Sequence, residues 1–213
     1  MKSLYIIVLL ISLLIYLTGC DKDEPSKVFG TVSVYPNNDP VSDGLISLRA
    51  QVIEQGSFNN NFQTIKDTYT NHSGGFEISF DPIRASVYRI DFTHNNYREK
   101  YLEFSSNNFT FSKQISMQVV VKAHLDVHIK NQNSPSESDE FRIRIKGIPD
   151  VCQDCSDSTF SVLTGADVDT TMTYQTAGND EVTLEYTTTD NNGEIVVETI
   201  YCVSGDNNIT IYY

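Results

Sequence analysis

The sequence predicts an all-β protein built from two consecutive antiparallel β-sandwich domains after a cleaved N-terminal signal peptide. Beyond an apolar N-terminal stretch, apolar and polar residues alternate in run after run, which is the pattern of half-buried strands. Turn residues separate the runs, and helical periodicity is almost absent. Repeated short strands with turns between them are typical of β-sandwiches.

Four runs in the first half have apolar residues at alternate positions. Because successive side chains of a strand point to opposite faces, the apolar residues of each run share one face and are expected in a core. The predicted inward sets are Val28, Gly30, Val32 and Val34; Ile46, Leu48, Ala50 and Val52; Phe76, Ile78 and Phe80; and Tyr88, Ile90 and Phe92.

The second half contains two more such runs and then the pattern of a C-terminal meander. Its turns are predicted at residues 190–193, which read Asp-Asn-Asn-Gly, and at residues 204–207, which read Ser-Gly-Asp-Asn. The predicted inward sets are Leu125, Val127 and Ile129; Phe141, Ile143 and Ile145; Val182, Leu184 and Tyr186; Ile195, Val197, Tyr201 and Val203; and Ile209, Ile211 and Tyr213.

Residues 1–19 have the features of a signal peptide, with Lys2 before an apolar segment that is too short to span a bilayer. The segment ends in Leu17-Thr18-Gly19-Cys20. This ending resembles the lipobox of bacterial lipoproteins, which implies a diacylglycerol on the Cys20 sulfur, cleavage before Cys20 and acylation of the new amine. Three acyl chains exceed what stable anchoring requires. The alternative is an ordinary cleaved signal with an accidental cysteine.

Residues 20–26 are predicted to form an acidic tether. The run Asp21-Lys22-Asp23-Glu24 partly resembles the signal that places some lipoproteins on the outer face of the outer membrane, which favours a lipid-anchored protein at the cell surface. Two alternatives remain. The run is equally consistent with a solvated spacer, and Asp21 directly after the cysteine is also found in lipoproteins kept at the inner membrane, on its periplasmic face.

The charge balance narrows the possible partners. The chain has 15 Lys and Arg residues against 28 Asp and Glu, for a net charge of −13. Such a chain repels phosphate backbones and anionic lipid surfaces, so nucleic-acid binding is not expected and membrane attachment should depend on the lipid at Cys20. No cofactor is predicted, and the expected partner is an envelope protein or a glycan.

With Cys20 lipidated, the remaining cysteines are Cys152, Cys155 and Cys202. A structural disulfide is the favoured interpretation, ahead of a redox pair or a zinc site, because the loop around the CxxC spacing is polar and lacks a fourth ligand. Alternation with Tyr201 predicts that Cys202 faces away from the core and bridges to Cys152 or Cys155. The sequence does not choose between these two.

Residues 27–121 contain an order of features that resembles a known domain family. A strand begins at residues 30–32, a loop crosses into the next strand at residues 40–48, and residues 70–78 make a tight turn into a third. This order resembles the carboxypeptidase-regulatory-like, or transthyretin-like, β-sandwich of bacterial surface lipoproteins. Asn71 stands where that family usually has Asp and is expected to form an Asx turn, while Gly74 fits a position with positive φ. The resemblance implies no catalytic residues.

Residues 122–213 are predicted to form a second sandwich directly after the first, because no Pro/Gly linker separates them. This unit resembles immunoglobulin-like domains only in strand count and turn spacing. Its loops are longer and more acidic, so we expect any partner-binding surface here and expect the first domain to be a spacer.

Candidate chemistry is sparse. No hydrolase, zinc-protease or phosphate-loop motif occurs, so neither catalytic nor metal-binding residues are assigned. The function predicted is therefore that of a non-enzymatic binding or scaffolding module. One alternative is a calcium-dependent adhesion module, and a less favoured one is an envelope hydrolase assembled from scattered residues. The acids considered for calcium are Asp150, Asp154, Asp157, Asp167 and Asp169.

Overall fold

Strands account for nearly all the regular structure of the computed structural model, which describes residues 25–54, 57–81, 83–108, 112–132, 136–189 and 193–213. The predicted all-β class is therefore confirmed; one short 3-10 turn, η1 (Ser106–Asn108), is the exception. The signal peptide, Cys20 and most of the tether lie outside the described residues, as does most of the turn predicted at residues 190–193. No helix in the described part of the chain is long and apolar enough to cross a membrane.

The first sandwich packs two sheets around one core. The smaller sheet has the order β5 (Gly75–Phe80), β1 (Ser26–Val34) and β8 (Ser112–Val119), with β1 and β8 parallel. The larger sheet contains β4 (Gln63–Tyr69), β2 (Leu45–Glu54), β6 (Ala85–Thr93) and β7 (Lys100–Ser105), and the short β3 (Ser57–Phe58) pairs with the end of β2.

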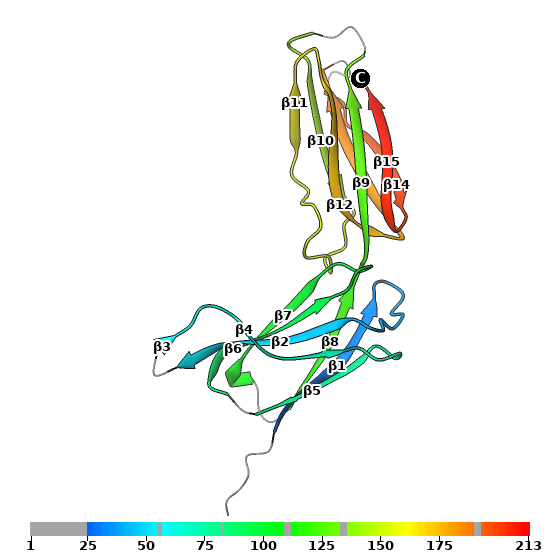
Figure 1. Ribbon diagram of the computed structural model, residues 1–213. Helices are drawn as coiled ribbons and strands as arrows, with labels where there is room; N and C mark the ends of the chain where they lie inside the picture. Colours follow the sequence, from blue (N-terminus) through cyan, green and yellow to red (C-terminus); the bar gives the residue numbers. More distant parts are fainter. Residues whose placement is uncertain (1–24, 55–56, 82, 109–111, 133–135, 190–192) are drawn as a thin grey trace, which may run out of the picture.

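One residue, Val120, separates the end of β8 from the first strand of the second sandwich. One of its sheets has the order β12 (Asp169–Gly178), β9 (Val121–Lys130) and β15 (Gly205–Tyr212), with β9 and β15 parallel. The other has the order β11 (Ser161–Thr164), β10 (Glu140–Lys146), β13 (Asp180–Thr188) and β14 (Val196–Cys202). Figure 1 shows the two sandwiches end to end, with the start of β1 at one end of the molecule and the C-terminus at the other.

The two domains share one strand topology. Apart from the short β3, the order β5-β1-β8 and β4-β2-β6-β7 recurs as β12-β9-β15 and β11-β10-β13-β14, with the same parallel pair of first and last strands. In an immunoglobulin fold the second and third strands lie in different sheets, whereas here they are neighbours in one sheet. The second domain therefore has the strand count of an immunoglobulin domain but not its strand order.

Each domain has its own apolar core, and most predicted inward residues belong to it. The first core includes Val28, Ile46 and Ile90, and the second includes Leu125 and Ile143, all with 0% exposure. The alternation that predicted these strands therefore also identifies their buried face.

Strand β14 is the exception, because its two faces are the reverse of those predicted. Val197 and Tyr201 are 59% and 58% exposed, while Cys202 is fully buried. Direct partners on antiparallel strands share a face. Since Leu184 and Val182 of β13 point inward, their partners Glu198 and Ile200 must do so as well.

The predicted C-terminal meander is also wrong at its last step. β13 and β14 pair antiparallel, but β15 crosses to the other sheet and pairs parallel with β9. The Asn207 side chain holds the crossing: its Oδ1 accepts a bond from the Val203 amide at 2.9 Å, and its Nδ2 donates to the His124 carbonyl at 3.0 Å.

The tight turn into β5 forms as its sequence predicted. Asn71 Oδ1 accepts hydrogen bonds from the amides of Ser73 and Gly75, both at 2.9 Å, and Gly74 has a φ of 73°. A Cβ at Gly74 would lie 2.4 Å from the carbonyl oxygen of Val32, so this position is both left-handed and crowded.

We predict that Gly74→Ala destabilises the protein by about 2–4 kcal/mol, because it adds a backbone clash to the left-handed strain. Gly205→Ala is the matched control, since Gly205 has a φ of 91° and nothing within 4 Å of a built Cβ. It should cost only about 1 kcal/mol. Urea unfolding of both variants measures the difference, and equal losses would contradict the role assigned to the Val32 carbonyl.

A polar pair lies at the inner side of β13 and β14. The Tyr186 hydroxyl donates to Glu198 Oε1 at 2.7 Å. Burial first, and then the Glu198 carboxylate, raise the pKa of Tyr186 to about 12. The folded protein therefore holds this proton in a pH range where the unfolded chain, with a tyrosine pKa near 10, releases it.

The contribution of this tyrosine to stability is complete below about pH 10 and is lost as the pH rises through about 12. We predict that the free energy of unfolding falls more steeply over this range in the wild type than in Tyr186→Phe, by up to about 2–3 kcal/mol in total. Denaturant titrations at several pH values test this, and parallel pH profiles would contradict it.

Candidate functional site

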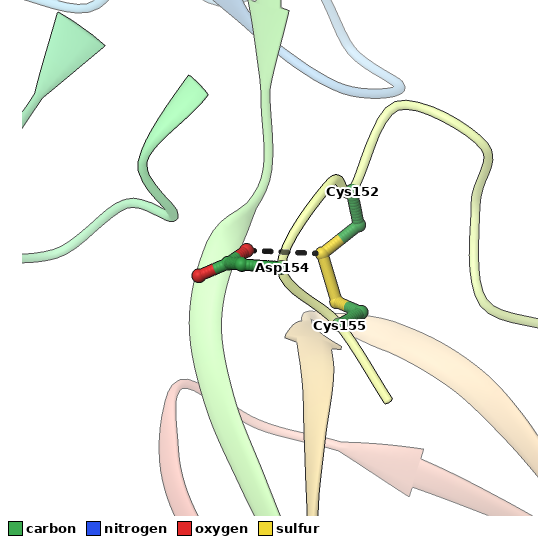
Figure 2. A group of neighbouring side chains, drawn as sticks. All are labelled: Cys152, Asp154 and Cys155. Carbon is green, nitrogen blue, oxygen red and sulfur yellow. Dashed lines mark hydrogen bonds between the residues drawn. A yellow bond between two sulfur atoms is a disulfide. The ribbon is translucent and has the colours of Figure 1, made fainter. Parts of the chain in front are cut away.

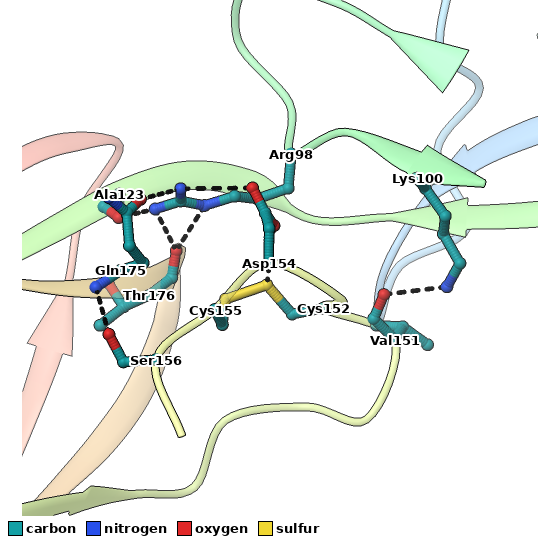
Figure 3. Close-up of a disulfide and its surroundings, with 10 residues drawn as sticks. All are labelled: Arg98, Lys100, Ala123, Val151, Cys152, Asp154, Cys155, Ser156, Gln175 and Thr176. Carbon is teal, nitrogen blue, oxygen red and sulfur yellow. Dashed lines mark hydrogen bonds and ion pairs between the residues drawn. A yellow bond between two sulfur atoms is a disulfide. The ribbon is translucent and has the colours of Figure 1, made fainter. Parts of the chain in front are cut away.

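The junction between the two sandwiches is held by a buried arginine. Arg98 lies in the β6–β7 loop of the first domain, is 5% exposed and extends into the second domain (Figure 3). Its Nε and one terminal nitrogen each donate to the Thr176 carbonyl at 3.3 Å, and the same terminal nitrogen donates to the Ala123 carbonyl. The other terminal nitrogen donates to Gln175 Oε1 and lies 3.6 Å from Asp154 Oδ2. A buried guanidinium is tolerated because acceptors surround it.

The backbone around Arg98 also joins the domains. The Arg98 amide donates to the Val120 carbonyl at 2.9 Å, and the Lys122 amide donates to the Asn96 carbonyl at 2.8 Å. Between these bonds Tyr97 and Val121 form an isolated antiparallel bridge. The segment that connects the domains is therefore paired with the β6–β7 loop, which removes its freedom to act as a hinge.

A disulfide shapes the loop on the other side of the junction. Cys152 and Cys155 are bonded within the β10–β11 loop, with their Cα atoms 5.5 Å apart (Figure 2). The Ser156 amide then donates to the Gln175 carbonyl at 3.0 Å, and Ser156 Oγ accepts from the Gln175 amide at 2.8 Å. These contacts attach the disulfide loop to β12.

The same loop contacts the first domain. The Gln153 side chain accepts from the Tyr101 amide at 3.0 Å and donates to the Tyr101 carbonyl at 3.2 Å. Because β7 is an edge strand, this amide takes the place of a neighbouring strand at that residue. Lys100 Nζ donates to the Val151 carbonyl at 2.9 Å, and burial lowers the pKa of this lysine.

A groove of about 300 Å³ lies beside the disulfide loop, over the outer face of the larger sheet. Asp91 stands within it and pairs with Arg49 Nε at 3.0 Å and with Arg89 Nε. The Arg89 guanidinium lies 4.0 Å from the centre of the Tyr101 ring, a cation–π contact. Paired guanidinium groups and a tyrosine ring are side chains that can bind a polar ligand. The described lining includes no His, Ser or Cys, while its Asp91 carboxylate is paired with two arginines and Lys100 donates to Val151.

The predicted pairing of Cys202 is wrong. The bond joins Cys152 to Cys155, and Cys202 is free and buried. The cause is the reversed face of β14, which turns Cys202 toward the core and away from the loops. Burial raises the pKa of its thiol, as expected for an unreactive core cysteine. Cys152, Asp154 and Cys155 lie close enough to suggest a metal site, but disulfide sulfurs are not thiolate ligands.

Among the described residues, the acids considered for calcium do not form a cluster of three carboxylate ligands. Asp154 pairs with Arg98 at the junction, whereas Asp169 pairs with Lys130 at the far end of β9, at 2.7 Å. Asp157 Oδ1 accepts from Thr159 within its own loop at 2.6 Å. Each of these three carboxylates therefore has a local partner, and the geometry of the described residues does not support the calcium alternative.

Comparisons with known proteins find only weak likenesses to solved structures. No family model matches the chain, and no curated protein matches it. The TIE protein of Bacillus anthracis has 10% identity and a TM-score of 0.37; the match covers 89% of this chain and 34% of that one, so this chain spans about a third of its length. The shaft pilin SpaA of Lactobacillus rhamnosus GG has 10% identity and a TM-score of 0.34, covering 88% of this chain and 97% of that one. GBS52, a minor pilin of Streptococcus agalactiae, has 11% identity and a TM-score of 0.34, with 88% and 94% covered. Likenesses this weak do not transfer a function.

We predict that Arg98→Met uncouples the domains. The methionine retains an apolar stem, but the acceptors on Ala123, Thr176 and Gln175 lose their donor, which should cost about 2–4 kcal/mol at the junction. Calorimetry should resolve two separated unfolding transitions, and small-angle scattering should show a broader range of overall lengths. Arg84→Met, at an exposed position, is the matched control. If the Arg98 variant kept the wild-type calorimetric profile, the junction would not depend on this residue.

Proposed function

We propose that the protein is a lipid-anchored, non-enzymatic module that presents its second domain at a fixed distance from an envelope membrane. One observation carries this proposal: the two sandwiches are joined end to end by a buried arginine, with the described N-terminal end and the C-terminus at opposite ends (Figure 1). A lipid at Cys20 would place the first domain next to the membrane and the end of the second domain farthest from it.

The first domain acts as the spacer in this proposal. Its resemblance to carboxypeptidase-regulatory-like domains supports that role, since such domains are scaffolds with many uses. The second domain carries the partner-binding surface. Its polar segments include residues 131–140, where Asn131 Nδ2 donates to Asp139 at 2.9 Å. Polar side chains at the far end of a stalk are suited to contact an envelope protein or glycan.

We predict that Cys20→Ala releases the protein into the soluble fraction, because the acidic surface offers no second membrane attachment. Membrane fractionation and detergent partitioning of wild type and variant measure this. Cys202→Ala is the control and should stay in the membrane fraction, as Cys202 is buried in the second core. Continued membrane association of the Cys20 variant would refute the anchor.

The side of the envelope is tested on intact cells with an added protease. Digestion of the anchored wild type without permeabilisation supports surface display. If the protease digests the protein only after the cells are permeabilised, the protein lies inside the envelope. The alternative interpretation of Asp21, as a signal for retention at the inner membrane, predicts this result.

A further inference from the structure

The outer face of the β11-β10-β13-β14 sheet carries most of the exposed apolar side chains of the described protein. Ten large apolar residues in the described chain are exposed, and six of these belong to this sheet or to its strand ends. The six are Phe160, Val162, Ile195, Val197, Tyr201 and Val203. The outer face of the partner sheet is mainly polar, with His128, Asp126 and Thr173 among its side chains, and Tyr212 is its exposed aromatic residue. An exposed apolar concentration of this kind marks an interaction surface.

The outward side chains form four columns, one on each strand. On β14 the apolar Val197 and Tyr201 flank Thr199, and on β13 the acidic Glu181 and Glu185 alternate with two threonines. On β10 the basic Arg142, Arg144 and Lys146 follow Glu140, which pairs with Arg142. On the β11 side Phe160 and Val162 precede Thr164. Apart from the threonines and Glu140, the order across the sheet is apolar, acidic, basic, apolar.

The strand register aligns these columns into rows. Val197 is paired with Glu185, and Glu185 with Arg144, whose guanidinium lies 4.3 Å from the centre of the Phe160 ring. Within the sheet Lys146 and Arg144 bind Glu185 at 2.8 Å and 2.6 Å, and Lys146 first, then Arg144, lower the pKa of its carboxyl. The charges are thus fixed in place at the centre of the face, with apolar side chains at both borders.

We propose that this face binds the same face of a second copy of the protein. If two copies stack with a two-fold axis parallel to the strands, β13 lies over the partner's β10, and β14 lies over the partner's β11. Acidic side chains then oppose basic ones, and the two apolar borders meet. A two-fold axis across the strands would instead set the basic column against itself, which like-charge repulsion disfavours.

The favoured axis also agrees with the proposed anchor. The strands of the second domain run along the length of the molecule (Figure 1), so a two-fold axis parallel to them leaves both N-terminal ends at the same side. Two copies tethered in one membrane can therefore pair without bending. The axis across the strands would send the two tethers in opposite directions.

The size of the face indicates a weak pair that depends on anchoring. Four strands about 4.8 Å apart and about seven residues long give a face on the order of 500 Å² for each copy. Stable interfaces bury about 800 Å² for each partner. Confinement to one membrane raises the effective concentration of the second copy and compensates for the small area. This part of the inference rests on the proposed anchor, whereas the charge pattern does not.

The test is cross-linking of the full-length anchored protein in cell membranes. Two differently tagged chains are expressed together, one with Val162→Cys and the other with Val197→Cys, and are treated with a short bifunctional maleimide. We expect cross-links between the two differently tagged chains. Few cross-links should form when either chain is expressed alone. Adding Tyr201→Asp to both chains should lower the cross-linked fraction about 10-fold, while Tyr69→Asp, at an exposed tyrosine of the first domain, should leave it unchanged.

Absence of cross-links between the two chains would overturn the inference, provided that both are found in the membrane fraction. Efficient cross-linking of Thr199→Cys chains with one another would also overturn it, because β14 would then lie against its own copy. Failure of the anchor is recognised separately, since the wild-type chain itself would then be recovered in the soluble fraction.

Discussion

The arrangement of the two domains depends on the burial of one guanidinium group. Arg98 belongs to the first sandwich, but most of its hydrogen-bond acceptors are backbone and side-chain oxygens of the second. Desolvating a charge is costly, and the cost is offset only while the two domains keep the position in which these acceptors converge. A joint made of apolar contacts would tolerate sliding, whereas a fan of directed hydrogen bonds tolerates little.

The disulfide loop is part of this junction between the two domains. A bond between cysteines three residues apart closes a very small loop, so it restricts the unfolded chain less than a long-range disulfide would. Its effect is local: it fixes the turn from which Gln153 reaches the edge of β7 and Asp154 reaches Arg98. Gln153 thereby pairs with part of the exposed edge of β7 in the first sandwich. Asp154 of the second sandwich supplies a negative charge beside Arg98.

The sequence predicts the strands and cores well because a sheet with one buried face imposes a strict period of two. Ile46, Leu48 and Ala50, for example, were all placed correctly and have 0% exposure. The prediction fails for β14, because Val196, Val197, Ile200 and Tyr201 make both faces of this strand apolar. Alternation alone therefore cannot identify the inner face. The pattern also does not mark β3, β4, β7, β8, β11 or β12, and in β12 the threonines give little contrast between the two faces. Arg98 could not be found in this way, since a charged residue between Tyr97 and Glu99 has the appearance of an exposed loop.

The failure at β14 and the proposed pairing surface have one origin. A strand that is apolar on both faces is typical of a position covered on both sides. In the single chain, the core covers Ile200 and Cys202, but Val197 and Tyr201 face solvent at more than half of their full exposure. The neighbouring strands place an acidic and a basic column beside this stripe, and a second apolar border closes the pattern. A face with this order is complementary to itself only when the two copies point the same way, which is the orientation that anchoring in one membrane would impose.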